Sequence, residues 1–175
     1  IALDGAGKII VGGYCNINQP DSARFVVLKY EQNLDFVWAT RCGNRGTGSP
    51  ASPFDLVVDM NSNIFVTGPN DNNFAVFKVN PDGTLSWNKF YHYSADIPRA
   101  IITDNSGNAY VTGESGSPGF PFSYSITTIK YDPNGNEQWI KNYNGGAVPD
   151  GYTGYDIAID NSANIYVTGN ISSTS

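Results

Sequence analysis

Hydrophobic and polar positions along the chain recur in a fixed order that predicts strands and turns. One stretch runs from an Asp to a Gly nine residues later, with no insertion or deletion between copies. Its four copies are residues 4–13, 59–68, 104–113 and 160–169. A second stretch alternates with the first and runs from a Lys to a Trp, again nine residues later. Its three copies are residues 29–38, 78–87 and 130–139. Repetition at a fixed spacing is typical of repeat architectures.

Each stretch predicts two strands joined by a turn. Residues 157–159, before Asp160, are apolar at successive positions, which predicts a short strand buried on both faces. The turn at 104–108 has Gly and Asn where a positive φ is needed, and the β-branched and aromatic residues 109–112 form the return strand. The Lys-to-Trp stretch repeats this plan. One repeat therefore holds four antiparallel strands over about 50 residues, which is the pattern of a propeller blade.

We therefore predict an all-β fold, a β-propeller segment of four-stranded antiparallel blades with three full blades plus half of a fourth. The blades are expected at about residues 1–43, 54–91 and 99–143, with the half-blade at about 155–175. Because the chain opens and closes inside a repeat, we expect it to be a segment of something longer. The remaining blades are then partners, supplied by the same chain or by another one.

Composition agrees with this prediction and excludes some functions. Tyr (11) and Phe (9) favour strands, while 19 Gly and 10 Pro mark frequent turns. The net charge of −6 comes without any cluster of Lys and Arg, so we expect no nucleic-acid partner. No apolar run approaches the roughly 18 residues that a membrane span needs, so we expect no membrane span.

The phrases YDIAIDNSANIYVTG, at residues 155–169, and TTIKYDPNGNEQWIKNYNG, at 127–145, resemble a known repeat family. This is the bacterial β-propeller repeat family called SBBP, for seven-bladed β-propeller. NHL-like propeller repeats are the nearest alternative, because IALDGAGKIIVGG at residues 1–13 departs toward them. The resemblance implies a propeller in a secreted or surface-attached bacterial protein, and hence an extracellular or cell-surface location. It carries no shared activity.

Length variation is confined to one end of the predicted blades. The turns after the first and third strands are constant, whereas Gly13 to Lys29, Gly68 to Lys78 and Gly113 to Lys130 span 16, 10 and 17 residues. Variable loops on a rigid scaffold are where function usually lies, so we expect ligand binding there. The candidate residues are Tyr93, Asp96, Phe120, Phe122, Tyr124 and Tyr152. The alternative is that these loops are ordinary and their rings cover the scaffold.

Catalytic and metal sites find little support. The repeated turns such as 132–136 place oxygen ligands at alternate positions, which suits calcium, but Pro133 and the missing Glu favour plain hairpin chemistry. We expect no metal and no cofactor, with calcium as the alternative. His92 is the single histidine, so neither a metal site nor a His-based triad is expected, and no catalytic residue is proposed. The three Trp are expected to pack in the core or between blades.

Cys15 and Cys42 both belong to the first repeat. Their strands are predicted to lie two places apart, roughly 10 Å, which is too far for a disulfide unless the loops converge. An extracellular location favours the bridge, so a disulfide between them stays open.

These observations predict a non-catalytic extracellular recognition or scaffold module that binds a glycan or protein partner through its variable loops. One alternative is a propeller enzyme acting on glycans, a hydrolase or lyase with its site at the central entrance. The other is a structural subunit of a cell-surface assembly.

Overall fold

The structure is a computed structural model, and it describes residues 1–15, 24–43, 51–92, 95–116, 123–145 and 151–172. Throughout these residues the chain forms strands and turns, with no helix, which confirms the predicted all-β class. No helix in these ranges is long and apolar enough to cross a membrane.

Two sheets hold four antiparallel strands each, in chain order. The first sheet is β1 (Ala2–Leu3), β2 (Ile9–Cys15), β3 (Arg24–Tyr30) and β4 (Phe36–Cys42). The second is β5 (Asp55–Val58), β6 (Ile64–Asn70), β7 (Asn73–Val79) and β8 (Leu85–Tyr91). These are the four-stranded units that the repeat predicts.

The remaining six strands form one continuous sheet. They are β9 (Asp96–Thr103), β10 (Ala109–Gly116), β11 (Tyr124–Tyr131), β12 (Glu137–Tyr143), β13 (Gly151–Ile159) and β14 (Ile165–Ser172). The sequence predicts a full blade and a separate half-blade here, but one parallel pair, Tyr124 with Gly151, joins them. The join forms because β12 pairs with β11 only from Ile126 onward, which leaves the edge at Tyr124 available.

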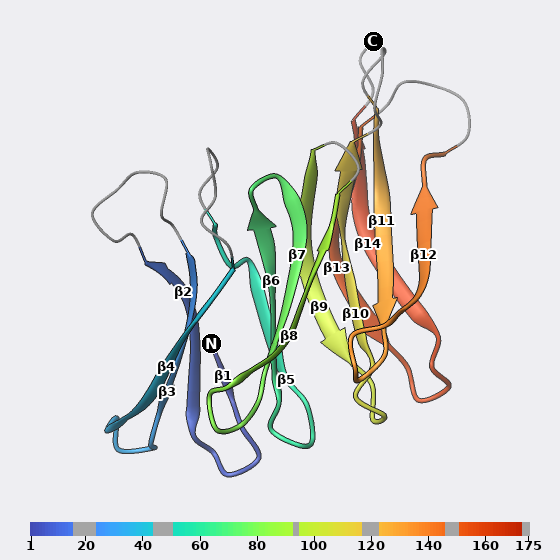
Figure 1. Cartoon of the computed structure of the whole chain (residues 1–175). Coiled ribbons are helices and arrows are strands. Elements are labelled where there is room, and N and C mark those ends of the chain that lie inside the picture. Colours follow the sequence, from blue (N-terminus) through green and yellow to red (C-terminus); the bar gives the residue numbers. More distant parts are fainter. Residues whose placement is uncertain (16–23, 44–50, 93–94, 117–122, 146–150, 173–175) are drawn as a thin grey trace.

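The sheets stand side by side, and the connections separate into two ends (Figure 1). The constant turns, including those between β1 and β2 and between β3 and β4, lie at the bottom, which we call the turn end. The strand ends that flank the segments of variable length lie at the opposite end, which we call the loop end. The first strands of successive units contact one another, β5 with β9 and β9 with β13, as expected of the innermost strands of blades.

Apolar side chains pack between neighbouring sheets. Phe25 and Val27 of β3 meet Ala75 and Phe77 of β7, and the rings of Phe25 and Phe77 lie 4.9 Å apart. A second cluster places Phe74 of β7 among residues that include Val111 and Ile129. These contacts put the core between the sheets.

The turns at the turn end take up the backbone conformation that their sequence predicts. Gly107 has φ of +77°, and Ser62 and Ala163 occupy the same repeat position at +62°. In the last unit, however, the prediction that residues 157–159 are buried on both faces is wrong. Ile157 is 5% exposed, but Ala158 is exposed because no sheet among the described residues covers that face.

Candidate functional site at the loop end and the inner strands

The repeated carboxylates of the turn end accept hydrogen bonds from their own turns. Asp104 Oδ1 accepts hydrogen bonds from the backbone N–H groups of Ser106 and Asn108, and Oδ2 accepts from the Asn108 side chain and the Tyr110 hydroxyl. Burial raises the pKa of Asp104, but these hydrogen bonds outweigh it and hold the pKa below its usual value. The Asp residues at the other turns of this kind, Asp4, Asp59 and Asp160, also accept two backbone N–H groups.

These hydrogen bonds explain why Asp recurs at this position, and the explanation does not require a bound metal. At the turn between β11 and β12, Asp132 accepts from Asn134 and Asn136 in the same way. The hydrogen bonds from Asn136 and Asn134 lower its pKa. Among the described residues, no group of three or more His, Cys, Asp or Glu side chains could hold a metal ion.

The recurring Lys and Trp residues clamp one sheet onto the next. Each Lys lies directly across from its Trp in the β-ladder, for example Lys78 opposite Trp87. The Trp87 indole N–H and the Lys78 ammonium both donate to the carbonyl oxygen of Pro133, at 3.0 and 2.9 Å. In the first sheet, Trp38 and Lys29 reach the carbonyl oxygen of Pro81 at 3.2 and 3.3 Å. The predicted packing of Trp between blades is confirmed for these two residues.

We call this arrangement the Trp–Lys clamp. It requires glycine two positions after the proline, because the Trp ring covers that residue. A Cβ on Gly83 would lie 2.8 Å from the Trp38 ring, and a Cβ on Gly135 would lie 2.9 Å from the Trp87 ring. The constant turns are therefore shaped by packing between sheets.

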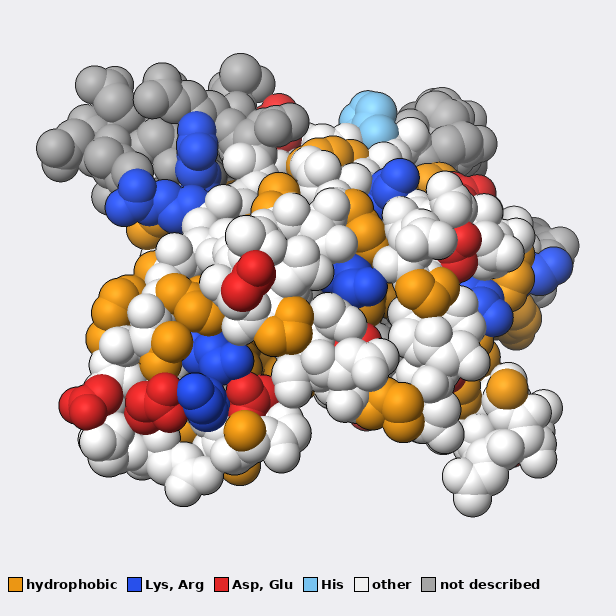
Figure 2. Space-filling model, turned by 60° about the horizontal axis from the view of Figure 1, so that its bottom comes forward, with side chains coloured by type: hydrophobic (Ala, Val, Ile, Leu, Met, Phe, Trp, Pro, Cys, Tyr) orange, Lys and Arg blue, Asp and Glu red, His pale blue; other side chains and the backbone are white. Residues whose placement is uncertain are grey.

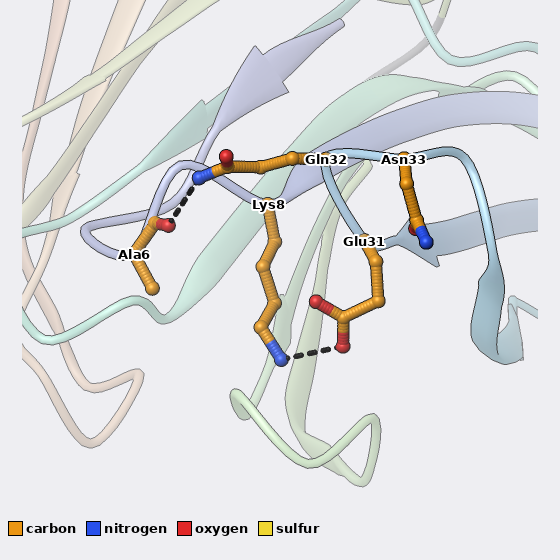
Figure 3. Close-up of a pocket in the computed structure, with 5 residues that line it drawn as sticks. All are labelled: Ala6, Lys8, Glu31, Gln32 and Asn33. Carbon is orange, nitrogen blue, oxygen red and sulfur yellow. Dashed lines mark hydrogen bonds and ion pairs between the residues drawn. The ribbon is translucent and has the colours of Figure 1, made fainter.

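A small polar pocket also lies between two turns of the first unit (Figure 3). Lys8 and Glu31 form an ion pair of 2.7 Å across it, and the Gln32 side chain donates to the carbonyl oxygen of Ala6. The two charged side chains of the pocket, Lys8 and Glu31, are thus paired with each other. The space-filling view from the turn end shows side chains of both charges beside apolar ones, without one dominant charged patch (Figure 2).

The residues predicted to bind ligand occupy different environments. The Asp96 side chain is fully buried and accepts a hydrogen bond from Ser115, while Tyr152 is 5% exposed with its ring 5.7 Å from that of Tyr143. Tyr124 is half-buried at the start of β11. Asp96 and Tyr152 are thus buried near the starts of β9 and β13. Tyr93, Phe120 and Phe122 lie outside the described residues.

His92 is an exposed ionisable group close to Asp96. Its side chain is 63% exposed, and Nδ1 lies 4.0 Å from Asp96 Oδ2. The neighbouring Ser115 hydroxyl donates to the carboxylate of Asp96, so this Ser is not aligned on the imidazole. The grouping lacks the nucleophile-to-base hydrogen bond of an activated serine.

Both cysteines are free thiols. Cys15 ends β2 and Cys42 ends β4, and β3 lies between these two strands. The disulfide that the sequence left open is therefore absent from the structure. Burial raises the pKa of Cys42 to about 12.

A row of side chains on or directly before the inner strands has no counterpart among the sequence predictions. The guanidinium of Arg99, on β9, lies 5.7 Å from the ring centroids of both Phe54 and Tyr155. Arg99 also donates to Glu114 at 2.7 Å, and the Thr153 hydroxyl donates to the other oxygen of that carboxylate. We call Phe54, Arg99 and Tyr155 the inner row. A sequence signal existed, since each residue stands five positions before the Asp of its turn.

The inner row combines chemistry suited to binding. The rings of Phe54 and Tyr155 are 47% and 49% exposed, although Arg99 lies between them. Arg99 Nε is buried and without a hydrogen-bond partner among the described residues. Half-exposed rings beside a cation and a buried carboxylate can stack on and hydrogen-bond to a polar ligand.

Two carboxylates follow the inner row directly in sequence. Burial raises the pKa of Asp55, although backbone N–H groups of Ile101 and Leu56 donate to it, and the charge of Asp156 raises it further. Asp156 is exposed and accepts from its neighbour Ile157. Asp55 therefore links β5 to β9 through Ile101.

The comparisons with known proteins agree with this architecture. Residues 92–121 match the family model described as Beta-propeller repeat, SBBP. The chain carries an SBBP β-propeller repeat. The predicted resemblance is thereby confirmed, and the repeat matched includes β9 and β10. No curated protein sequence matches the chain.

Solved structures give the fold and no activity. A protein of unknown function from Bacteroides caccae is similar over 89% of this chain, with 13% identity and a TM-score of 0.51. A gluconolactonase from Xanthomonas campestris has 13% identity over 83% of this chain, but its TM-score of 0.30 supports no inference. The chain spans 48% and 65% of these two proteins, less than two thirds of either.

Proposed function

We propose that this chain is part of a non-catalytic propeller that serves as a recognition or scaffold module outside the cell or at its surface. The observation that carries the proposal is the contrast between its two ends. At the turn end, the repeated Asp, Lys and Trp residues are used in capping turns and clamping sheets. The loop end varies in length and carries accessible groups such as His92 and Tyr14.

The inner row supports binding of a polar ligand such as a glycan, or of a protein partner. Aromatic rings present large rigid surfaces at low entropic cost, and sugars stack on them while charged groups bind their hydroxyls. Phe54 and Tyr155 supply such rings, and Glu114 supplies a carboxylate in the same place. In this group Phe54 directly precedes β5, and Arg99 and Tyr155 lie in the middle of β9 and β13.

A glycan hydrolase or lyase at the central entrance is the second candidate, and one observation favours it. Burial raises the pKa of Asp55, the charge of Asp156 raises it further, and glycosidases act through a pair of carboxyl groups. We favour binding because the Asp55 carboxylate is used by two backbone N–H groups. A structural subunit of a surface assembly is the third candidate.

A glycan panel probed with the purified chain tests the proposal. Replacing Phe120, Phe122 and Tyr124 together by Ser, or Tyr155 alone, is expected to abolish binding with little change in Tm. Asn134→Ser at an exposed turn-end position is the control and is expected to bind normally. The proposal is wrong if only the control variant loses binding. It is also wrong if the chain binds neither glycans nor protein partners.

Measuring the reducing sugar released from the same glycan panel distinguishes an enzyme from a binding module. If the chain cleaves a glycan and both Asp55→Asn and Asp156→Asn abolish cleavage, the catalytic candidate replaces the binding one. We expect no release from any member of the panel.

A further inference from the structure

A polar pocket of about 420 Å³ lies between the outer strands of the second and third sheets. Residues 89–92, from β8 and the position after it, line it from the second sheet. Tyr131, Gly135 and Glu137, from β11, the following turn and β12, line it from the third sheet. Small-molecule sites have volumes of roughly 300–1,000 Å³, so the pocket is large enough for a small ligand.

Lys89 extends from the second sheet over a turn of the third. Side chains alternate along a strand, so Lys89 points to the same side of β8 as Trp87. Its Cε would lie 2.9 Å from a Cβ on Gly135, so the stem of Lys89 crosses this turn. Hydrogen bonds from Asn136 are the main cause of the lowered pKa of Asp132, and the charge of Lys89 lowers it further. The Lys89 ammonium nevertheless forms no ion pair or hydrogen bond with any residue that the structure describes.

Glu137 enters the same pocket from the third sheet. The ladder between β11 and β12 shifts register between Lys130 and Tyr131, and this bulge places Glu137 opposite Tyr131. Burial raises the pKa of Tyr131 and the charge of Glu137 raises it further, so the carboxylate lies near the Tyr131 ring. Within the described part of the chain, no hydrogen bond or ion pair reaches this carboxylate. In the pocket of the first unit, by contrast, Lys8 and Glu31 pair with each other.

The matching contact between the first and second sheets carries neither of these charges. Thr40 stands in the place of Lys89, two positions after the Trp, and its hydroxyl donates to the carbonyl oxygen of Gly83. Leu85 stands in the place of Glu137, two positions before the Trp. Packing one sheet against the next therefore does not require the two charges.

We propose that this pocket binds a small zwitterion of the size of an amino acid, with its carboxylate on Lys89 and its ammonium group on Glu137. Both contacts are charge-assisted, which makes them stronger than neutral hydrogen bonds. A ligand with a single charge would place that charge near the like-charged one of the two residues. The rings of Tyr91 and Tyr131 supply the aromatic part of the lining. The pocket shares no residue with the inner row, so this site goes beyond the proposed recognition function.

Saturation-transfer NMR with the unmodified chain and a mixture of free proteinogenic amino acids tests the site. At least one of them is expected to bind, and calorimetric titration then gives its Kd. The amide of that amino acid lacks the carboxylate, and its N-acetyl form lacks the ammonium group. Each derivative is expected to bind at least about tenfold more weakly than the free amino acid. This comparison requires no change to the protein.

Matched variants then assign the two contacts. Lys89→Gln and Glu137→Gln are each expected to weaken binding at least about tenfold, because each removes one charged partner. Lys141→Gln is the control, since it removes a Lys at the same distance from its Trp but outside the pocket, and it is expected to bind normally. The amide and Lys89→Gln remove the same contact, so together they should weaken binding no more than either does alone.

No binding of any amino acid at millimolar concentration would overturn the proposal, as would equal binding of the free, amidated and acetylated forms. Equal losses with Lys141→Gln and Lys89→Gln would also overturn it, because the ligand would then not lie in this pocket. Tyr155→Ser alters the inner row and is expected to leave amino-acid binding unchanged. The outcome is therefore independent of whether the chain binds glycans or protein partners.

Discussion

The indole N–H of Trp87 and the carbonyl oxygen of Pro133 lie 3.0 Å apart, although the residues are 46 positions apart in the chain. The bond joins the second sheet to the third, and Lys78 shares the same carbonyl. A tryptophan that looks like a core residue in the sequence thus works as a directional contact between units.

Trp87→Phe is expected to lower the free energy of unfolding by about 1 kcal/mol more than Trp139→Phe does. Both changes remove the same atoms, but only Trp87 loses a hydrogen bond within the described chain, and such a bond contributes on the order of 1 kcal/mol. Urea unfolding of the two variants measures the difference. Equal losses would show that the Pro133 contact adds nothing to stability.

Two glycines with similar φ angles allow the cost of a positive φ to be separated from the cost of steric crowding. Gly107 has φ of +77° and Gly135 has φ of +81°, but an added Cβ meets nothing closer than 3.7 Å at Gly107 and lies 2.9 Å from the Trp87 ring at Gly135. Gly107→Ala is expected to cost about 1–2 kcal/mol, the cost of an Ala in the left-handed region.

Gly135→Ala is expected to cost about 1–3 kcal/mol more than Gly107→Ala, because the indole has to move. Combining Gly135→Ala with Trp87→Ala should remove most of this excess, because the rigid ring is gone and the other close atom, Lys89 Cε at 2.9 Å, belongs to a flexible side chain. Thermal or urea unfolding of the three variants checks both statements. An excess that persists in the double variant would contradict the assignment to the ring.

Acid is expected to destabilise the fold through the turn carboxylates. The pKa values of Asp4, Asp82, Asp104, Asp132 and Asp160 are all lowered in the folded chain. A lowered folded pKa adds stability that is complete above the unfolded value of about 4 and is lost as the pH falls through the folded value. Urea midpoints should therefore be nearly constant from pH 7 to about 5 and fall below it.

Asp104→Asn isolates one of these turns. At pH 7 it is expected to cost about 1 kcal/mol, because an amide nitrogen faces the donors from Asn108 and Tyr110. At pH 2, where the wild-type carboxyl is itself protonated, the difference should shrink toward zero. A cost that stays the same at both pH values would show that the charge of Asp104 is not what the turn uses.

The two thiols are expected to react at very different rates. At pH 8, a thiol reagent should label Cys15 in the folded chain, while Cys42 reacts only after unfolding, because it is 1% exposed and burial raises its pKa to about 12. Cys15→Ser should abolish labelling of the folded protein. An unreduced chain two mass units lighter than the reduced one would instead reveal a disulfide.

The sequence by itself determined the strands, the turns and their spacing. Asp104 with Gly107 and Asn108 encodes a turn through local hydrogen bonds and one positive φ, so neighbouring residues suffice to predict it. Lys130 and Trp139 mark the second hairpin for the same local reason, since they face each other across a short turn. Propeller blades followed because these local units repeat.

Only the tertiary structure decided which side chains meet across units. Pro133 gives no sign in the sequence that its carbonyl binds Trp87. Phe54, Arg99 and Tyr155 share one repeat position, but that position alone does not show that the two rings flank Arg99. The same holds for Asp96 and Tyr152, whose polar and aromatic side chains suggested exposure but are buried. Contacts between blades depend on how whole sheets twist and stack, and the pattern of one strand specifies which face is apolar without specifying its partner.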